Sequence, residues 1–144
     1  MSAAADVLTG TELLESLYDD LDGALGRVVL EDVSLRNAGG GVTLNVRFLD
    51  FPGEPPERWV ERGYNTVTAQ IVCGEVESLS LEGWAADTRC SVRVSLTGGL
   101  KQLEVVGEHV RLTVRSADLG VMNARGDRLP EDTLRRVLRS EFAD

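Results

Sequence analysis

The chain has 144 residues, of which 42% are hydrophobic and 27% are charged, a composition typical of one globular domain that folds without disulfides. Its 15 basic and 24 acidic residues give a formal net charge of −9, which argues against nucleic acid as a partner, because phosphate backbones select a stripe of Lys and Arg. No run approaches the roughly 20 apolar residues that cross a bilayer, and no basic and apolar leader opens the chain. We therefore expect a single cytoplasmic domain over residues 1–144, without a membrane partner.

The N-terminal segment is predicted to hold one short helix. Behind Thr11, a candidate N-cap, apolar residues recur at helical spacing: Leu13, Leu14, Leu17 and Tyr18. The acids and glycines of residues 19–26 then predict a loop. The first 26 residues contain six acids and no Lys or Arg, a charge that suits a basic protein partner or, alternatively, only keeps the protein soluble.

From Arg27 onward the chain predicts antiparallel strands, because apolar and polar residues alternate with a period of two. A one-residue shift of that alternation at Glu31 and Asp32 indicates a β-bulge. A glycine-rich turn over 37–41 then leads into a second strand over 42–48.

The alternation resumes after a proline-rich segment. Gly74 separates the apolar runs 67–71 and 79–81, which predicts a hairpin. Three further runs alternate over 90–96, 100–105 and 110–114. Residues 116–126 are ambiguous, with an eighth strand as one interpretation. The predicted fold class is mainly β within α+β: an antiparallel meander of seven to eight strands, forming a two-layer sandwich or a curled sheet, with a short N-terminal and a C-terminal helix.

The C-terminal helix is predicted over 129–142, with Pro130 in its first turn. Its apolar stripe consists of Leu134, Val137, Leu138 and Phe142. A helix of about a dozen residues is marginal alone in water. We therefore expect the stripe to dock on the sheet or on another chain, including a second copy in a homo-oligomer. The core of the domain is placed at 11–125.

Residues 50–63 are predicted to form a stiff connection without regular structure. The stiffness comes from three residues that fix φ and lack an N–H, Pro52, Pro55 and Pro56. We interpret Trp59 as the side chain that pins this connection to the sheet, with an exposed aromatic anchor as the alternative. Trp84, which follows a glycine, is likewise interpreted as a core residue.

The sequence offers no catalytic or metal-binding pattern. His109 falls on the polar face of a predicted strand and is interpreted as a surface residue. Cys73 and Cys90 continue apolar faces, which indicates buried thiols rather than nucleophiles, zinc ligands or a disulfide. The acids within 19–22 have the carboxylates that a hard cation prefers but lack the rest of a calcium loop. We therefore expect no enzymatic activity, no cofactor and no metal.

Four short pieces follow one another in an order that resembles a known family: Ser16-Leu17-Tyr18, Phe51-Pro52-x-x-Pro55-Pro56-x-x-Trp59, Tyr64-Asn65-x-Val67 and Leu81-x-Gly83-Trp84. In this succession, over residues 13–125, the chain resembles the immunity protein 50 family of bacterial polymorphic toxin systems. The resemblance implies a small cytoplasmic protein that binds a cognate toxin domain and blocks it without catalysis. The helix after Pro130 is additional to the resemblance, and Asp19 and Asp20 replace a glycine turn of the family.

An acidic surface is the predicted means of partner binding, because it complements the basic cleft of a nuclease, one class of toxin. The candidate partner-binding residues are Asp19, Asp20, Asp22, Glu54, Glu57 and Trp59. The alternative is a non-catalytic β-sandwich module that binds a small ligand or a sugar, which would require a large internal pocket. A third interpretation is a structural protein that pairs through its C-terminal stripe.

Overall fold

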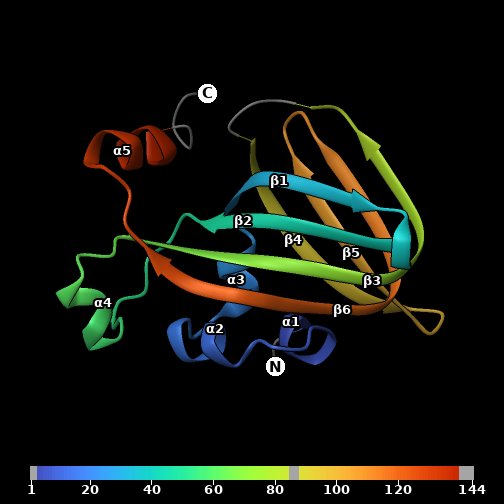
Figure 1. The fold of residues 1–144 in the computed structure, drawn as a ribbon, viewed down its shortest axis with the longest axis horizontal. Coiled ribbons are helices and arrows are strands. Elements are labelled where there is room, and N and C mark those ends of the chain that lie inside the picture. Colours follow the sequence, from blue (N-terminus) through green and yellow to red (C-terminus); the bar gives the residue numbers. More distant parts are fainter. Residues whose placement is uncertain (1–2, 85–87, 140–144) are drawn as a thin grey trace.

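The computed structural model describes residues 3–84 and 88–139, and these form a barrel of six antiparallel strands (Figure 1). The strands are β1 (Val28–Arg36), β2 (Gly41–Phe48), β3 (Thr66–Glu82), β4 (Thr88–Thr97), β5 (Leu100–Gly107) and β6 (Arg111–Asp127). Around the barrel their order is β1, β2, β3, β6, β5 and β4, and β4 pairs with β1 to close the sheet. The described helices are α1 (Ala3–Val7), α2 (Glu12–Leu17), α3 (Leu21–Leu25), the 3-10 turn η1 (Ala38–Gly40), α4 (Glu57–Glu61) and α5 (Glu131–Arg139).

The predicted β class is confirmed, but the predicted number of strands is wrong, because the described chain has six strands rather than seven to eight. β3 runs through Gly74 without a turn, and the suggested eighth strand is the second half of β6. Register shifts interrupt the β3–β6 pairing between Thr68 and Gln70 and between Val76 and Ser78. Each shift changes the face that the following residues occupy, so a bulge within one strand resembles the end of a strand in the sequence.

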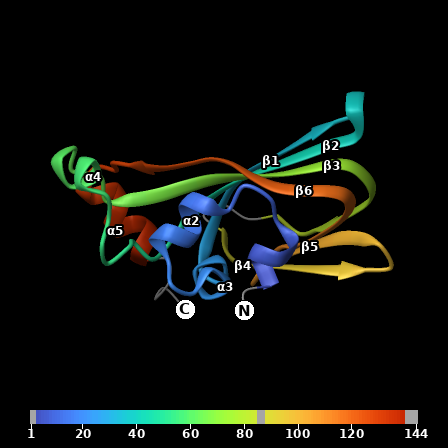
Figure 2. The same ribbon diagram turned by 90° about the horizontal axis from the view of Figure 1, so that it is seen from below.

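β3 and β6 are each 17 residues long and curve, so that each contributes to both layers of a flattened barrel (Figure 2). The first half of β3 pairs with β2 from Val67 to Cys73, whereas its second half pairs with the first half of β6. Apolar side chains from both layers fill the interior, including the almost fully buried Leu44, Ile71 and Leu112. The sheet is thus closed into a barrel rather than left as a sandwich or an open curl.

Helices α1 to α3 pack along one side of the barrel (Figures 1 and 2). The connection between α1 and α2 is held against β6, because the Thr9 N–H donates to the Leu119 carbonyl oxygen at 3.1 Å. α2 confirms the predicted N-terminal helix. The predicted loop over 19–26 is wrong where it includes α3, which forms because Leu21 and Leu25 recur at helical spacing and are buried against the barrel.

The proline-rich connection contains one short helix, α4, with Pro56 as its N-cap residue, where the sequence predicted no regular structure. The C-terminal helix is confirmed as α5, and Phe142 of its predicted stripe lies outside the described residues. Trp84 is 68% exposed, so its predicted place in the core is wrong. The preceding Gly83 has a φ of 80°, and a Cβ there would lie 2.0 Å from the His109 carbonyl oxygen, so this position after β3 requires glycine. None of the described helices is both long and apolar enough to cross a membrane.

Candidate partner-binding face

The three predicted aspartates lie exposed at the junction of α2 and α3, but two of them also hold helix ends. Asp20 caps α3, because its carboxylate accepts a hydrogen bond from the Gly23 N–H at 3.0 Å. Asp22 accepts from the first two N–H groups of α1, those of Ala3 at 3.0 Å and Ala4 at 2.9 Å. Asp19 has no such bond within the described residues, so its charge is available to a partner.

A hydrogen bond joins this junction to the proline-rich connection. The Tyr18 hydroxyl donates to the Asp50 carbonyl oxygen at 2.6 Å, and the Tyr18 ring stacks on Phe48 with ring centroids 5.2 Å apart. The Asp50 carboxylate also pairs with Arg27, with Nε and Oδ2 3.0 Å apart. Burial, and then the charge of Asp50, raise the pKa of the Tyr18 hydroxyl, so it remains a neutral donor. Asp19 directly follows Tyr18 in the sequence, and Glu54 lies a few residues after Asp50.

Trp59 is 7% exposed, which confirms its predicted role of pinning the connection to the sheet. Its ring lies 6.4 Å from that of Phe51 and 6.1 Å, edge to face, from that of Tyr64. Gly126 of β6 packs directly against this cluster. A Cβ on Gly126 would lie 2.6 Å from the Tyr64 ring and 2.8 Å from the Trp59 ring. Glu57, two residues before Trp59, is exposed.

A groove of about 340 Å³ lies between α2, α4 and β6, with Trp59 and Tyr64 among its lining residues. Three arginines also line it: Arg58, Arg62 and Arg125. Arg62 donates to the Tyr64 hydroxyl at 3.3 Å, and its guanidinium lies 6.0 Å from the centre of that ring. Within residues 3–84 and 88–139, neither Arg58 nor Arg125 has an acidic partner. Glu57, which directly precedes Arg58, therefore lies beside a positively charged groove that the sequence did not indicate.

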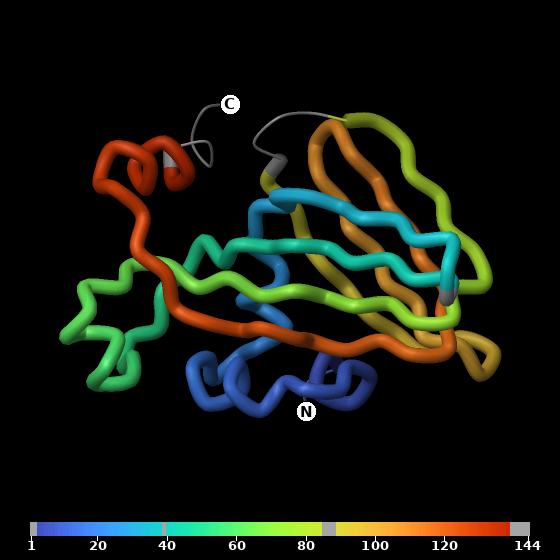
Figure 3. The backbone as a smooth tube through the Cα atoms, in the orientation of Figure 1, coloured from blue at the N-terminus to red at the C-terminus, as the bar shows by residue number. Residues whose placement is uncertain are grey.

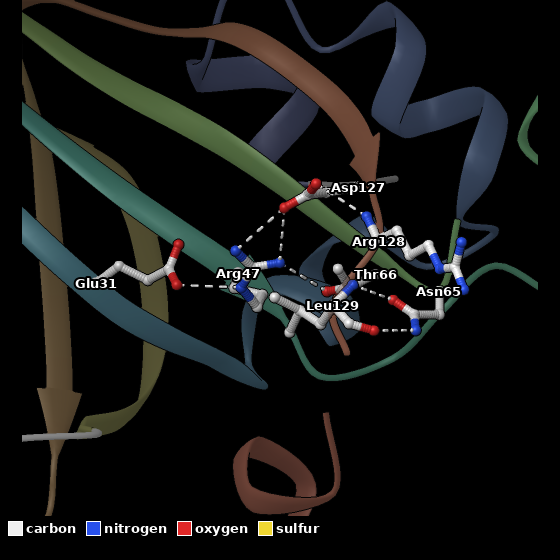
Figure 4. Close-up of polar contacts among 7 residues, drawn as sticks. All are labelled: Glu31, Arg47, Asn65, Thr66, Asp127, Arg128 and Leu129. Carbon is white, nitrogen blue, oxygen red and sulfur yellow. Dashed lines mark hydrogen bonds and ion pairs between the residues drawn. The ribbon is translucent and has the colours of Figure 1, made fainter. Parts of the chain in front are cut away.

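A second groove, of about 400 Å³, crosses the outer face of β1, β2, β3 and β6. Arg47 lies in it with only 8% of its surface exposed, and Figure 4 shows the polar contacts that surround its guanidinium. Arg47 pairs with Glu31 at 3.1 Å and with Asp127 at 3.5 Å, and it donates to the Thr66 hydroxyl at 3.3 Å. Both charged partners are more exposed than Arg47, so the groove presents fixed carboxylates to solvent.

Asn65 fixes the segment that leads into α5 (Figure 4). Its side-chain amide donates to the Leu129 carbonyl oxygen and accepts from the Leu129 N–H, both at 2.9 Å. The Asp127 carboxylate accepts the next bond, from the Arg128 N–H at 2.9 Å. These bonds position the start of α5 beside the end of β6.

The two cysteines are buried, protonated thiols. Burial raises the pKa of the Cys73 thiol to about 12 and that of the Cys90 thiol to about 11, so both are neutral at physiological pH. His109 is exposed, as predicted, and its Nε2 lies 3.9 Å from Glu108 Oε1. Among the residues that the structure describes, no three His, Cys, Asp or Glu side chains gather as metal ligands. Both grooves open at the surface and are lined by charged residues, unlike the internal pocket that a small-ligand module requires.

Fold and face together define a small antiparallel β-barrel protein with a charged face built by α2, α4 and the end of β6. The family model of immunity protein 50 matches residues 10–118. The chain therefore belongs to the immunity protein 50 family, as its sequence pieces predicted. The match runs from before α2 into the middle of β6 and leaves out α5. No curated protein matches the chain.

Proposed function

We propose that this protein binds a cognate toxin domain and blocks it by occlusion, with no reaction of its own. Membership of the immunity protein 50 family is the observation that carries this proposal. The rigid attachment of the charged face supports it, because a surface whose side chains are already positioned loses less conformational entropy on binding. Tyr18, Trp59 and Gly126 provide that attachment.

The partner surface that fits this face is mainly basic. Asp19, Glu54 and Glu57 are exposed and have no hydrogen bond or ion pair within the described chain, so a basic cleft such as that of a nuclease would bind them without displacing an internal partner. Asp20 and Asp22 also contribute negative charge to this face, while their carboxylates accept hydrogen bonds from helix N–H groups. Trp59 contributes as the floor of the arginine groove rather than as a protruding anchor.

The arginine groove adds a second expectation about the surface of the toxin. Arg58 and Arg125 are exposed and have no acidic partner within the described residues, so a toxin with at least one carboxylate beside its basic surface fits the whole face best. A purely basic surface would leave these two guanidiniums desolvated and unpaired, at a cost in affinity. The face therefore favours a toxin surface that carries both basic and acidic residues.

The test is co-expression with the protein encoded by the neighbouring reading frame, the candidate toxin, together with affinity measurements on the purified pair. Charge reversal of the three unpaired acids, Asp19→Lys with Glu54→Lys and Glu57→Lys, should weaken binding by at least about tenfold and abolish protection of the cell. The thermal unfolding temperature should change little, because these side chains form no hydrogen bond or ion pair within the described residues and only Glu57 lies in the first turn of a helix.

Asp132→Lys is the matched control, since Asp132 is equally exposed but lies on α5, outside the region that the family model matches. Its affinity should remain that of the parent protein. If the triple variant protects the cell as well as the parent does, the acidic residues are not the binding surface. If the parent protein itself neither binds nor protects against the toxin, the proposed function is wrong.

A further inference from the structure

Several strand edges lack a partner strand within residues 3–84 and 88–139, and two of them, on β1 and β3, matter here. β1 pairs with β4 only from Val28 to Leu30, so its remainder, 31–36, pairs on the β2 side alone. β3 has no β2 partner beyond Cys73, so its residues 76–82 pair with β6 alone. Backbone N–H and C=O groups on such edges are free to form a ladder with another strand.

The two edges border the same opening. At one end η1 closes it, because a Cβ on Gly40 would lie 3.8 Å from the Val76 nitrogen. At the other end β1 meets β4 in the pair Leu30 and Thr88. Figure 3 shows the second half of β3 curving past the end of β1, with β5 and β6 visible between the two.

Apolar side chains at the opening are exposed although their alternation places them toward the interior. Leu79 and Leu81 lie opposite Val114 and Leu112 of β6, which are fully buried, yet they are 37% and 38% exposed. Leu35 on β1 is 62% exposed. The inner face of the barrel is therefore uncovered along these two edges, and a further strand would bury it.

Charge decides which strand fits. The β3 edge carries Glu77 and Glu82 and no Lys or Arg. The β1 edge carries Asp32 and Glu31, the latter paired with Arg47, and one basic residue, Arg36. A second copy of this chain would place glutamates against glutamates, which is unfavourable between neighbouring strands. A strand that alternates apolar residues with Lys or Arg would direct the first set inward onto the leucines and the second outward toward the carboxylates.

We propose that this opening, bounded by residues 31–36 of β1 and 76–82 of β3, receives an extended basic strand of the toxin and completes the barrel by β-strand addition. The inference rests on the proposed function for the identity of the partner. The strand forms backbone bonds along an open edge, its apolar residues cover Leu35, Leu79 and Leu81, and its basic residues face the glutamates.

Hydrogen exchange on the full-length protein, alone and with the toxin, is the first experiment. The amides of 31–36 and 76–82 should become at least about tenfold more protected in the complex. Leu35→Ser should weaken toxin binding about tenfold, whereas the matched control Leu96→Ser, 63% exposed at the far end of β4, should stay within about twofold. Unchanged exchange at both edges, or equal affinities for the two variants, would overturn the inference.

A toxin-independent probe separates this inference from the proposed function. A peptide of about ten residues that alternates valine and lysine should bind the full chain saturably, and Glu77→Lys with Glu82→Lys should weaken binding about tenfold. A peptide with glutamate in place of lysine, or one methylated at alternate backbone nitrogens, should not bind. Toxin neutralisation that depends on Asp19 while the lysine peptide fails to bind would leave the proposed function standing and refute strand addition. Self-association through this edge would refute it as well.

Discussion

Tyr18 donates its hydroxyl proton to the Asp50 carbonyl oxygen at 2.6 Å, and this one bond joins the end of α2 to the start of the proline-rich connection. The two segments are 32 residues apart in the chain, and β1 and β2 lie between them. The bond therefore sets how the aspartates at the α2–α3 junction lie relative to the acids before and within α4. The spatial pattern of charge on the proposed binding face depends on it.

Tyr18→Phe removes this bond and keeps the ring that stacks on Phe48. We expect a loss of about 1 kcal/mol in the free energy of unfolding, the usual net contribution of one hydrogen bond, measured by urea titration. Toxin affinity should fall as well, because the two acidic segments would no longer be held together. Tyr18→Leu, which also removes the stacking, should cost more than Tyr18→Phe. Equal stability of the parent and the Phe variant would show that the bond does not restrain the connection.

Gly126→Ala should disturb the aromatic cluster. A Cβ there would lie 2.6 Å from the Tyr64 ring and 2.8 Å from the Trp59 ring, so both rings must shift, at a cost of about 1 to 3 kcal/mol in unfolding free energy. The fluorescence emission of Trp59 should change. Gly53→Ala is the matched control, because nothing lies within 4 Å of its Cβ position. A Gly126→Ala protein as stable as the Gly53→Ala protein would contradict the packing described for α4.

Some of these features could be predicted from the sequence, and others could not. β2 alternates without interruption, and the bulge in β1 at Leu30 and Asp32 is visible as a shift of phase, so both were predicted correctly. The β4–β5 turn was predictable because Gly98 and Gly99 supply the positive φ values of 59° and 83° that it requires.

β3 and β6 were divided in error because bulges interrupt their alternation. Positive φ values at Glu75 and Asn123, both non-glycine residues, accompany these irregularities and leave no clear mark in the sequence. The arginine groove was missed for another reason. Arg58 and Arg125 come from elements 67 residues apart (125 minus 58) and meet only because β6 returns beside the proline-rich connection. No local pattern could have brought them together.

The Arg47 network makes a prediction about buried charge. Glu31→Gln with Asp127→Asn should destabilise the protein by about 1 to 3 kcal/mol, because the guanidinium stays buried without a compensating charge. Adding Arg47→Met to that double variant should restore most of the loss, since a side chain of similar length then fills the site without a charge. Urea unfolding of the three proteins measures this cycle. If Arg47→Met lowers stability further in that background, the guanidinium contributes through its bond to Thr66 rather than through its ion pairs.

The buried thiols predict how stability depends on pH. Burial raises the pKa of Cys73 to about 12 and that of Cys90 to about 11, so the folded protein holds both protons where the unfolded chain, with thiol pKa values near 8.5, begins to lose them. The stabilisation of the folded protein that results from this pKa difference is fully present below about pH 8.5, and it is lost as the pH rises through the folded pKa values. Urea unfolding at pH 8 and pH 10.5 should therefore show a decrease for the parent protein, to which Tyr18 contributes with the same sign. Cys73→Val with Cys90→Val should reduce the decrease. Rapid modification of either thiol in the folded protein at pH 8 would contradict the burial on which this prediction depends.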